Sequence, residues 1–147
     1  MLENHQGESR FQNTMAGLSD AALLSGLAAS QPVSLPDEVY LFDFSKPQLN
    51  GWKCPLPYSI GKYDEIRPHI YTSALFNNER DLHVGLDIGG PVNTPVHSCL
   101  DGDVFWSGYH SEEGDYGNTV ITIHQVSERT LYILYGHLSA QSTELFK

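Results

Sequence analysis

A histidine and an aspartate stand four positions apart in the segment "HVGLDIGGPVNTP", which begins at His83. An imidazole nitrogen and a carboxylate oxygen are both ordinary zinc ligands, and a catalytic zinc usually has three protein ligands and a water. His83 and Asp87 therefore predict two ligands of a metal site that still needs a third. The alternative is that His83 only forms a hydrogen bond with Asp87 or a backbone carbonyl, because a motif without its context is weak evidence.

The residues of this motif alternate as they would in a β-strand, where successive side chains point to opposite faces. The residues on one face are His83, Gly85 and Asp87, and those on the other are Val84, Leu86 and Ile88. We expect the aliphatic face to be buried, and the other face to place a side-chain-free glycine between the imidazole and the carboxylate. A helix would also bring positions 83 and 87 together, but the "GGP" at 89–91 disfavours a helix here.

The rest of the second half of the chain consists of short apolar runs separated by turn residues. Such a pattern predicts a mainly antiparallel β domain from about Val39 onward. The turns are marked by glycine, asparagine and aspartate, as in "DG" at 101–102 and "EEGDYGN" at 112–118. The expected strands cover residues 39–44, 83–88, 95–100, 102–109, 119–125 and 130–137.

The first part of the chain has a different character. Residues 1–35 are polar and irregular, which indicates a flexible N-terminal extension with one weak helix at about 19–27. The "QPVSLP" at 31–36 marks the boundary. The total of 147 residues suits one domain, which we place at 36–147.

Composition excludes some classes of partner. The net charge of -10, from 18 acidic and 8 basic residues, repels phosphate backbones, so no nucleic-acid partner is expected. No apolar run approaches the roughly 20 residues of a membrane-spanning helix. No convincing signal peptide is present, which by sequence indicates the cytoplasm but leaves the compartment unknown. Cys54 and Cys99 are too few for a disulfide framework and lack C-x-x-C spacing.

Three motifs together resemble the lysostaphin-type, LytM-like family of zinc endopeptidases, which cut peptide cross-links in bacterial cell walls. The segment "HVGLDIGGPVNTPVHSCLDGDVFWSGY" is similar to the family's H-x-G-x-D strand, its G-x-P-V type turn and its D-G-x-V hairpin. "YGNTVITIHQ" resembles the next strand of the family, and "LYILYGHLS" resembles its Y-x-H-L-S segment. Matched context is what confirms a motif, so three motifs in the right order are far more specific than one.

The resemblance implies the antiparallel β-sheet core of a LytM-like peptidase domain, with Zn²⁺ as cofactor and a peptide or peptidoglycan as substrate. His83 and Asp87 correspond to two of the family's three zinc ligands. His137 corresponds to a catalytic histidine that does not bind the metal. Such a group titrates near neutral pH, so it can exchange protons or donate a hydrogen bond to a developing oxyanion. Taken alone, His137 could equally be a capping or core histidine.

One part of the family's pattern has no counterpart here. Family members carry an H-x-H pair on a later strand, whose second histidine completes the metal site, and this sequence contains no such pair. We therefore expect a domain that is incomplete at its C-terminus and inactive as an isolated chain. The alternatives are a non-catalytic peptidoglycan- or protein-binding module and a fragment of a longer multidomain protein. No ligand role is predicted for the other histidines, His5, His69, His97, His110 and His124.

Overall fold

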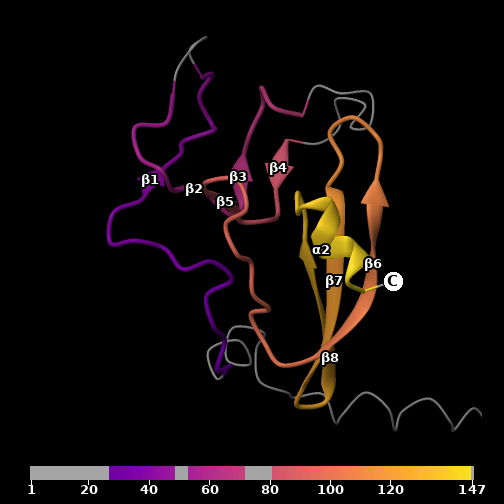
Figure 1. Cartoon of the computed structure of the whole chain (residues 1–147). Helices are drawn as coiled ribbons and strands as arrows, with labels where there is room; N and C mark the ends of the chain where they lie inside the picture. Colours follow the sequence, from indigo (N-terminus) through magenta and orange to yellow (C-terminus); the bar gives the residue numbers. More distant parts are fainter. Residues whose placement is uncertain (1–26, 49–52, 72–80, 147) are drawn as a thin grey trace, which may run out of the picture.

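The structure is a computed structural model that describes residues 27–48, 53–71 and 81–146 (Figure 1). Within these ranges it is mainly β, as the sequence predicts, and no helix there is long and apolar enough to cross a membrane. The elements are β1 (Tyr40–Leu41), β2 (Ser59–Gly61), β3 (Glu65–Ile66), β4 (Leu82–His83), β5 (Asp87–Gly89), β6 (Asp103–His110), β7 (Gly117–Val126), β8 (Arg129–Tyr135) and the helix α2 (Ala140–Glu144).

In the described part of the chain the strands form three sheets, and the first two consist of short strands. The first has the order β1-β2-β5, the second pairs β3 with β4, and the third has the order β6-β7-β8. All pairings are antiparallel except that of β1 with β2. The first two sheets, which we call the small sheets, carry Asp87 (in β5) and His83 (in β4). The long β7-β8 hairpin ends two residues before His137.

One face of the β6-β7-β8 sheet forms the core. Alternate residues of β7 are buried on it, namely Val120, Thr122, His124 and Val126. Helix α2 lies on this face, where the Ser107 hydroxyl donates to the Thr143 carbonyl at 2.8 Å. The segment before β6 also contacts this face, because the backbone N–H of Cys99 donates to the Tyr135 hydroxyl at 2.9 Å.

The opposite face of the same sheet is apolar but exposed. Phe105 and Tyr132 meet edge to face with ring centroids 5.0 Å apart, and they are 58% and 55% exposed. Trp106 and Leu134 both stand opposite Ile121 in the strand register and are also exposed. An exposed apolar face of this kind favours association with another surface.

The prediction of one continuous strand at 83–88 is wrong. β4 ends at His83 and pairs with β3, whereas β5 begins at Asp87 and pairs with β2, so the chain passes from one sheet to another between them. Val84 and Leu86, which we expected to be buried, are 69% and 56% exposed. Alternation predicts the side to which a residue points, but not whether another element covers that side.

The predicted strand at 95–100 is also absent. This segment forms backbone hydrogen bonds with the N-terminal segment, from Ser30 N–H to the Cys99 carbonyl and from His97 N–H to the Pro32 carbonyl, both at 2.8 Å. Two isolated bonds do not make a ladder, and Pro95 has no N–H to add. The expected helix at about 19–27 lies outside the described residues apart from its last position, and the domain boundary near residue 35 stays a prediction.

Candidate metal centre

His83 and Asp87 come from different sheets, yet their side chains face each other. The strand register places His83 opposite Glu65 and Asp87 opposite Gly61. His83 Nε2 lies 3.4 Å from Asp87 Oδ1. The structure therefore brings the two predicted ligands together, although by a turn between two sheets and not by a shared strand face.

The other ring nitrogen of His83 is held by the backbone. His83 Nδ1 lies 3.1 Å from the Lys62 carbonyl oxygen. Because a carbonyl only accepts, this contact is a hydrogen bond when Nδ1 carries the proton, and in that neutral tautomer the lone pair of Nε2 is on the side of Asp87. Metal-ligating histidines usually have this arrangement, in which the second nitrogen donates to a carbonyl or carboxylate and fixes the ring.

The spacing of the two side chains fits a zinc ion between them. Ligand atoms about 2.0–2.1 Å from a tetrahedral zinc stand about 3.3 Å apart, close to the observed 3.4 Å from His83 Nε2 to Asp87 Oδ1. The same distance is longer than the roughly 2.7–3.2 Å of an ordinary N–H···O hydrogen bond. Gly85 leaves space at the ring, since a Cβ there would lie 3.2 Å from His83 Nε2. We call the facing pair of His83 and Asp87 the half-site.

The second carboxylate oxygen of Asp87 is bound to Arg67. Arg67 Nη1 donates to Asp87 Oδ2 at 2.6 Å, and Arg67 Nε donates to Glu65 Oε2 at 3.0 Å. Burial disfavours the charged guanidinium, but its bonds to Asp87 and Glu65 outweigh this and raise the pKa of Arg67. Burial also opposes ionisation of Glu65, and the bonds from Lys62 and Arg67 outweigh it and lower the pKa of Glu65. Both charges are therefore maintained inside the fold.

A third ligand is missing from the described ranges, which contain no group of three His, Cys, Asp or Glu side chains able to hold a metal ion. His69 and His97 are exposed on loops. His110 packs on Trp106, with ring centroids 4.9 Å apart, and its Nδ1 lies 3.6 Å from Asp115 Oδ2. The half-site therefore offers a metal two protein ligands.

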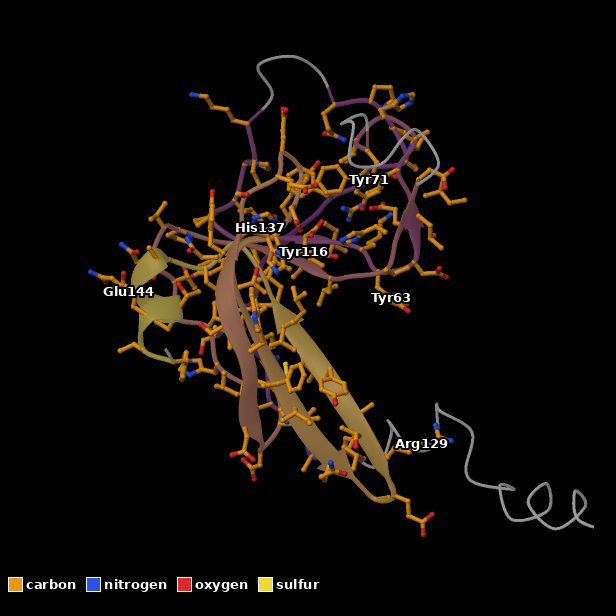
Figure 2. The ribbon with its side chains drawn as sticks, turned by 90° about the vertical axis from the view of Figure 1, so that its right-hand side faces the viewer. Tyr63, Tyr71, Tyr116, Arg129, His137 and Glu144 are labelled. Atoms are coloured by element: carbon orange, nitrogen blue, oxygen red, sulfur yellow. The ribbon has the colours of Figure 1, made fainter. Side chains whose placement is uncertain are left out.

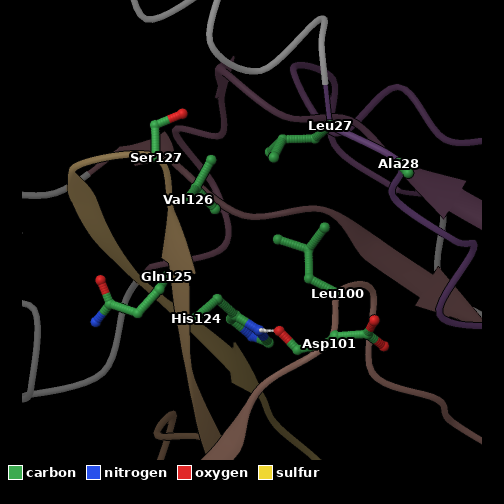
Figure 3. A pocket seen from close by; sticks show the side chains of 8 residues that line it. All are labelled: Leu27, Ala28, Leu100, Asp101, His124, Gln125, Val126 and Ser127. Carbon is green, nitrogen blue, oxygen red and sulfur yellow. Dashed lines mark hydrogen bonds between the residues drawn. The ribbon is translucent and has the colours of Figure 1, made fainter.

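His124 is a structural residue of the core. Its side chain lines an open pocket with Asp101 and residues of the N-terminal segment (Figure 3). Both ring nitrogens already have partners: Nδ1 lies 2.9 Å from the Asp101 carbonyl oxygen, and Nε2 lies 2.6 Å from Thr122 Oγ1. Both nitrogens are therefore engaged within the fold.

His137 follows β8 in the left-handed conformation, with φ of 56°. Its backbone N–H donates to the Tyr116 carbonyl at 2.7 Å, which ties it to the start of β7. Figure 2 shows His137 and Tyr116 at the end of the long hairpin nearest the small sheets, with Arg129 at the far end. Its ring is exposed, as a proton-transfer group must be to reach a substrate, and its catalytic role stays a prediction.

Tyr71 is electrostatically linked to the charged residues beside the half-site. Burial raises the pKa of its phenol, and the nearby charges of Asp87 and Tyr116 act in the same direction, against the lowering effect of Arg67. Tyr71 therefore interacts with the Arg67 and Asp87 charges beside the half-site.

The sequence did not reveal Arg67 and Glu65 as parts of this site. They occur in "KYDEIRP" at 62–68, which we interpreted only as part of a loop-rich segment. The available signal was their i, i+2 spacing, which places both side chains on one face if the segment is extended. Nothing local indicates that Arg67 meets a carboxylate 20 positions away.

Comparison with protein-family models gives a match in the second half of the chain. Residues 81–145 match the family model named Peptidase family M23. The matched range holds His83, Asp87 and His137, and it spans the elements from β4 to α2. No curated protein and no solved structure matches the chain.

Proposed function

We propose, from the match of residues 81–145 to the model of peptidase family M23, that this domain is of the zinc endopeptidase type and acts on peptide cross-links like those of peptidoglycan. The observation that carries the proposal is the half-site, with His83 Nε2 and Asp87 Oδ1 3.4 Å apart. A neutral imidazole and a carboxylate are suitable donors for zinc. The LytM-like motifs of the sequence assign the metal to the same two residues.

Each of the three predicted residues has a distinct part in the proposed reaction. His83 and Asp87 hold the metal, and the Lys62 carbonyl keeps His83 in the tautomer that ligates through Nε2. Bound zinc would polarise the scissile carbonyl and lower the pKa of a water molecule. His137 would exchange a proton with the reacting groups or donate a hydrogen bond to the developing oxyanion.

We further propose that this chain alone is inactive. Two protein ligands bind zinc much more weakly than the three of a usual catalytic site. In the family the third comes from an H-x-H segment, and the sequence contains none. A histidine supplied by such a segment, from outside these residues, would complete the site.

The test compares this chain with a chimera in which the H-x-H strand of a complete family member follows residue 145. Zinc affinity and peptide release from pentaglycine and peptidoglycan are measured for both. We expect tight zinc binding and activity in the chimera only, and loss of both after Asp87→Ala. A chimera that binds zinc tightly but releases no peptide contradicts endopeptidase activity. Chelator-sensitive activity of the unextended chain shows instead that its own residues, or a second copy, supply the third ligand.

One observation favours a second candidate function, a non-catalytic module that binds peptidoglycan or another protein. It is the lack of a three-ligand group within residues 27–48, 53–71 and 81–146. A binding module needs no metal, so its affinity for purified peptidoglycan should be unchanged by Asp87→Ala or by chelator. A co-sedimentation assay with purified cell walls separates this function from the enzymatic one.

A further inference from the structure

Arg67 is the most enclosed charged residue beside the half-site. Its side chain is 4% exposed, while that of Asp87 is 50% exposed. Its guanidinium lies over the Phe44 ring, 4.6 Å from the ring centroid, in a cation–π contact. An arginine buried in this way must have its charge compensated, because an unpaired buried charge is costly.

The compensating contacts fix the orientation of the guanidinium. Nε donates to Glu65 Oε2 at 3.0 Å, Nη1 to Asp87 Oδ2 at 2.6 Å, and Nη2 to the Lys62 carbonyl at 3.3 Å. The backbone N–H of Phe44 in turn donates to Glu65 Oε1 at 3.2 Å. Three rigidly spaced donors with three separate acceptors leave Arg67 little freedom to rotate.

We propose that Arg67 is a positioning residue of the half-site: by holding Oδ2 of Asp87, it turns Oδ1 toward His83 Nε2 and keeps Asp87 a one-oxygen ligand. The proposal rests on the proposed metal site. The same Lys62 carbonyl accepts from both Arg67 Nη2 and His83 Nδ1. Residues 62–67 therefore contact both ligands, His83 through the Lys62 carbonyl and Asp87 through Arg67. The sequence alone assigned no role to this segment.

Gly61 shows how closely this contact is packed. A Cβ at Gly61 would lie 2.7 Å from Asp87 Oδ2 and 2.9 Å from Arg67 Nη2. Any side chain there would have to displace one partner of the pair. Gly61→Ala therefore disturbs the contact between Arg67 and Asp87 without altering any charge.

The test uses the full chain and two measurements. Zinc titration followed by NMR at the His83 ring gives the dissociation constant even when binding is weak. Nuclear Overhauser contacts between Asp87 β-protons and the His83 ring, without zinc, report whether the pair keeps its arrangement. Arg67→Lys keeps the positive charge and removes the planar guanidinium with its fixed donors. Arg129→Lys is the control, because it makes the same change at the far end of the hairpin.

We expect Arg67→Lys to weaken zinc binding about tenfold or more, as loss of an outer-shell partner commonly does. It should also weaken the metal-free contacts of Asp87 with His83. Gly61→Ala should act in the same direction, whereas Arg129→Lys and Gly90→Ala, whose added methyl would meet Thr94 and Tyr58, should change neither measurement.

Unchanged metal-free contacts in Arg67→Lys would overturn the positioning role, whatever zinc does. If the contacts are lost but zinc affinity is unchanged, Arg67 orders the pair without serving the metal, and the proposal is equally wrong. Absence of zinc binding by the wild-type chain at any concentration is a different result, because it contradicts the proposed metal site itself.

Discussion

At the scale of single residues, the half-site depends on charges held inside the protein. Glu65 is buried and ionised, with Lys62 Nζ 3.1 Å from Oε1 and Arg67 Nε 3.0 Å from Oε2. The Glu65 carboxylate compensates the buried charge of Arg67, which in turn binds Asp87. The stability of this cluster therefore depends on the ionisation of Glu65 and so on pH.

The pKa of Glu65 is lowered from 4.5 in the folded protein, so below that value the unfolded chain binds the proton more readily. The stability that Glu65 contributes is present above pH 4.5 and is lost as the pH falls through the folded pKa. We expect Glu65→Gln to flatten the fall of the unfolding free energy in acid. At neutral pH it should cost about 1–3 kcal/mol, because Arg67 loses a buried ionic partner. Denaturant unfolding across pH measures both effects, and identical pH profiles for the two proteins would contradict them.

At the scale of elements, the predictable part of the fold is the part made by local pairing. The expected strands at 102–109, 119–125 and 130–137 correspond to β6, β7 and β8, because turn residues between alternating runs specify hairpins. The expected strand at 83–88 failed because its two ends pair with β3 and with β2, which lie 16–18 and 26–30 residues earlier in the chain. The local alternation of apolar and polar residues does not indicate which distant strand a segment pairs with.

The candidate site was predictable to the same extent. His83 and Asp87 were predicted as ligands from residue type and spacing together with the family resemblance, and His137 from the resemblance, and these roles stay predictions. Arg67 was not, since its partner Asp87 is set by the pairing of β2 with β5 and not by any nearby sequence. Exposure of Val84 and Leu86 was missed for a related reason, because burial depends on what other elements cover.

A second prediction belongs to strand β7. His124 is 1% exposed and both ring nitrogens are partnered, so His124→Leu leaves the Asp101 carbonyl without its donor. We expect the unfolding free energy to fall by about 1–3 kcal/mol. Zinc affinity should be unchanged, because His124 has no part in the half-site. The exposed His97 provides the control, as His97→Leu should alter neither quantity. A large loss of zinc affinity in folded His124→Leu would contradict the structural role.

At the scale of the whole molecule, two surface features oppose each other. The β6-β7-β8 sheet has an exposed apolar face, and its outer strands each pair only with β7 in the described part of the chain. Open edges and apolar faces favour association. The net charge of -10 repels other copies, most strongly at low salt.

We therefore expect self-association that increases with salt, since screening removes the repulsion and leaves the apolar contact. Sedimentation velocity at about 20 mM and about 500 mM NaCl measures this. The Debye length is long at the lower concentration, where charge repulsion acts between molecules, and short at the higher one, where it is screened. Replacing Phe105 and Tyr132 together with Thr should keep the protein monomeric at the higher salt concentration. A wild-type chain that is monomeric in both conditions would show that the exposed face does not drive association.

The central claim is that His83 and Asp87 form half of a zinc site, with His83 ligating through Nε2. The most direct measurement is ¹⁵N NMR of the histidine rings during zinc addition. We predict a saturable shift of His83 Nε2 while Nδ1 remains protonated, as its bond to the Lys62 carbonyl at 3.1 Å requires. The shift should disappear in Asp87→Ala, and both nitrogens of His124 should stay unchanged. Zinc that leaves Nε2 of His83 unaffected, or that deprotonates Nδ1 instead, would contradict the account.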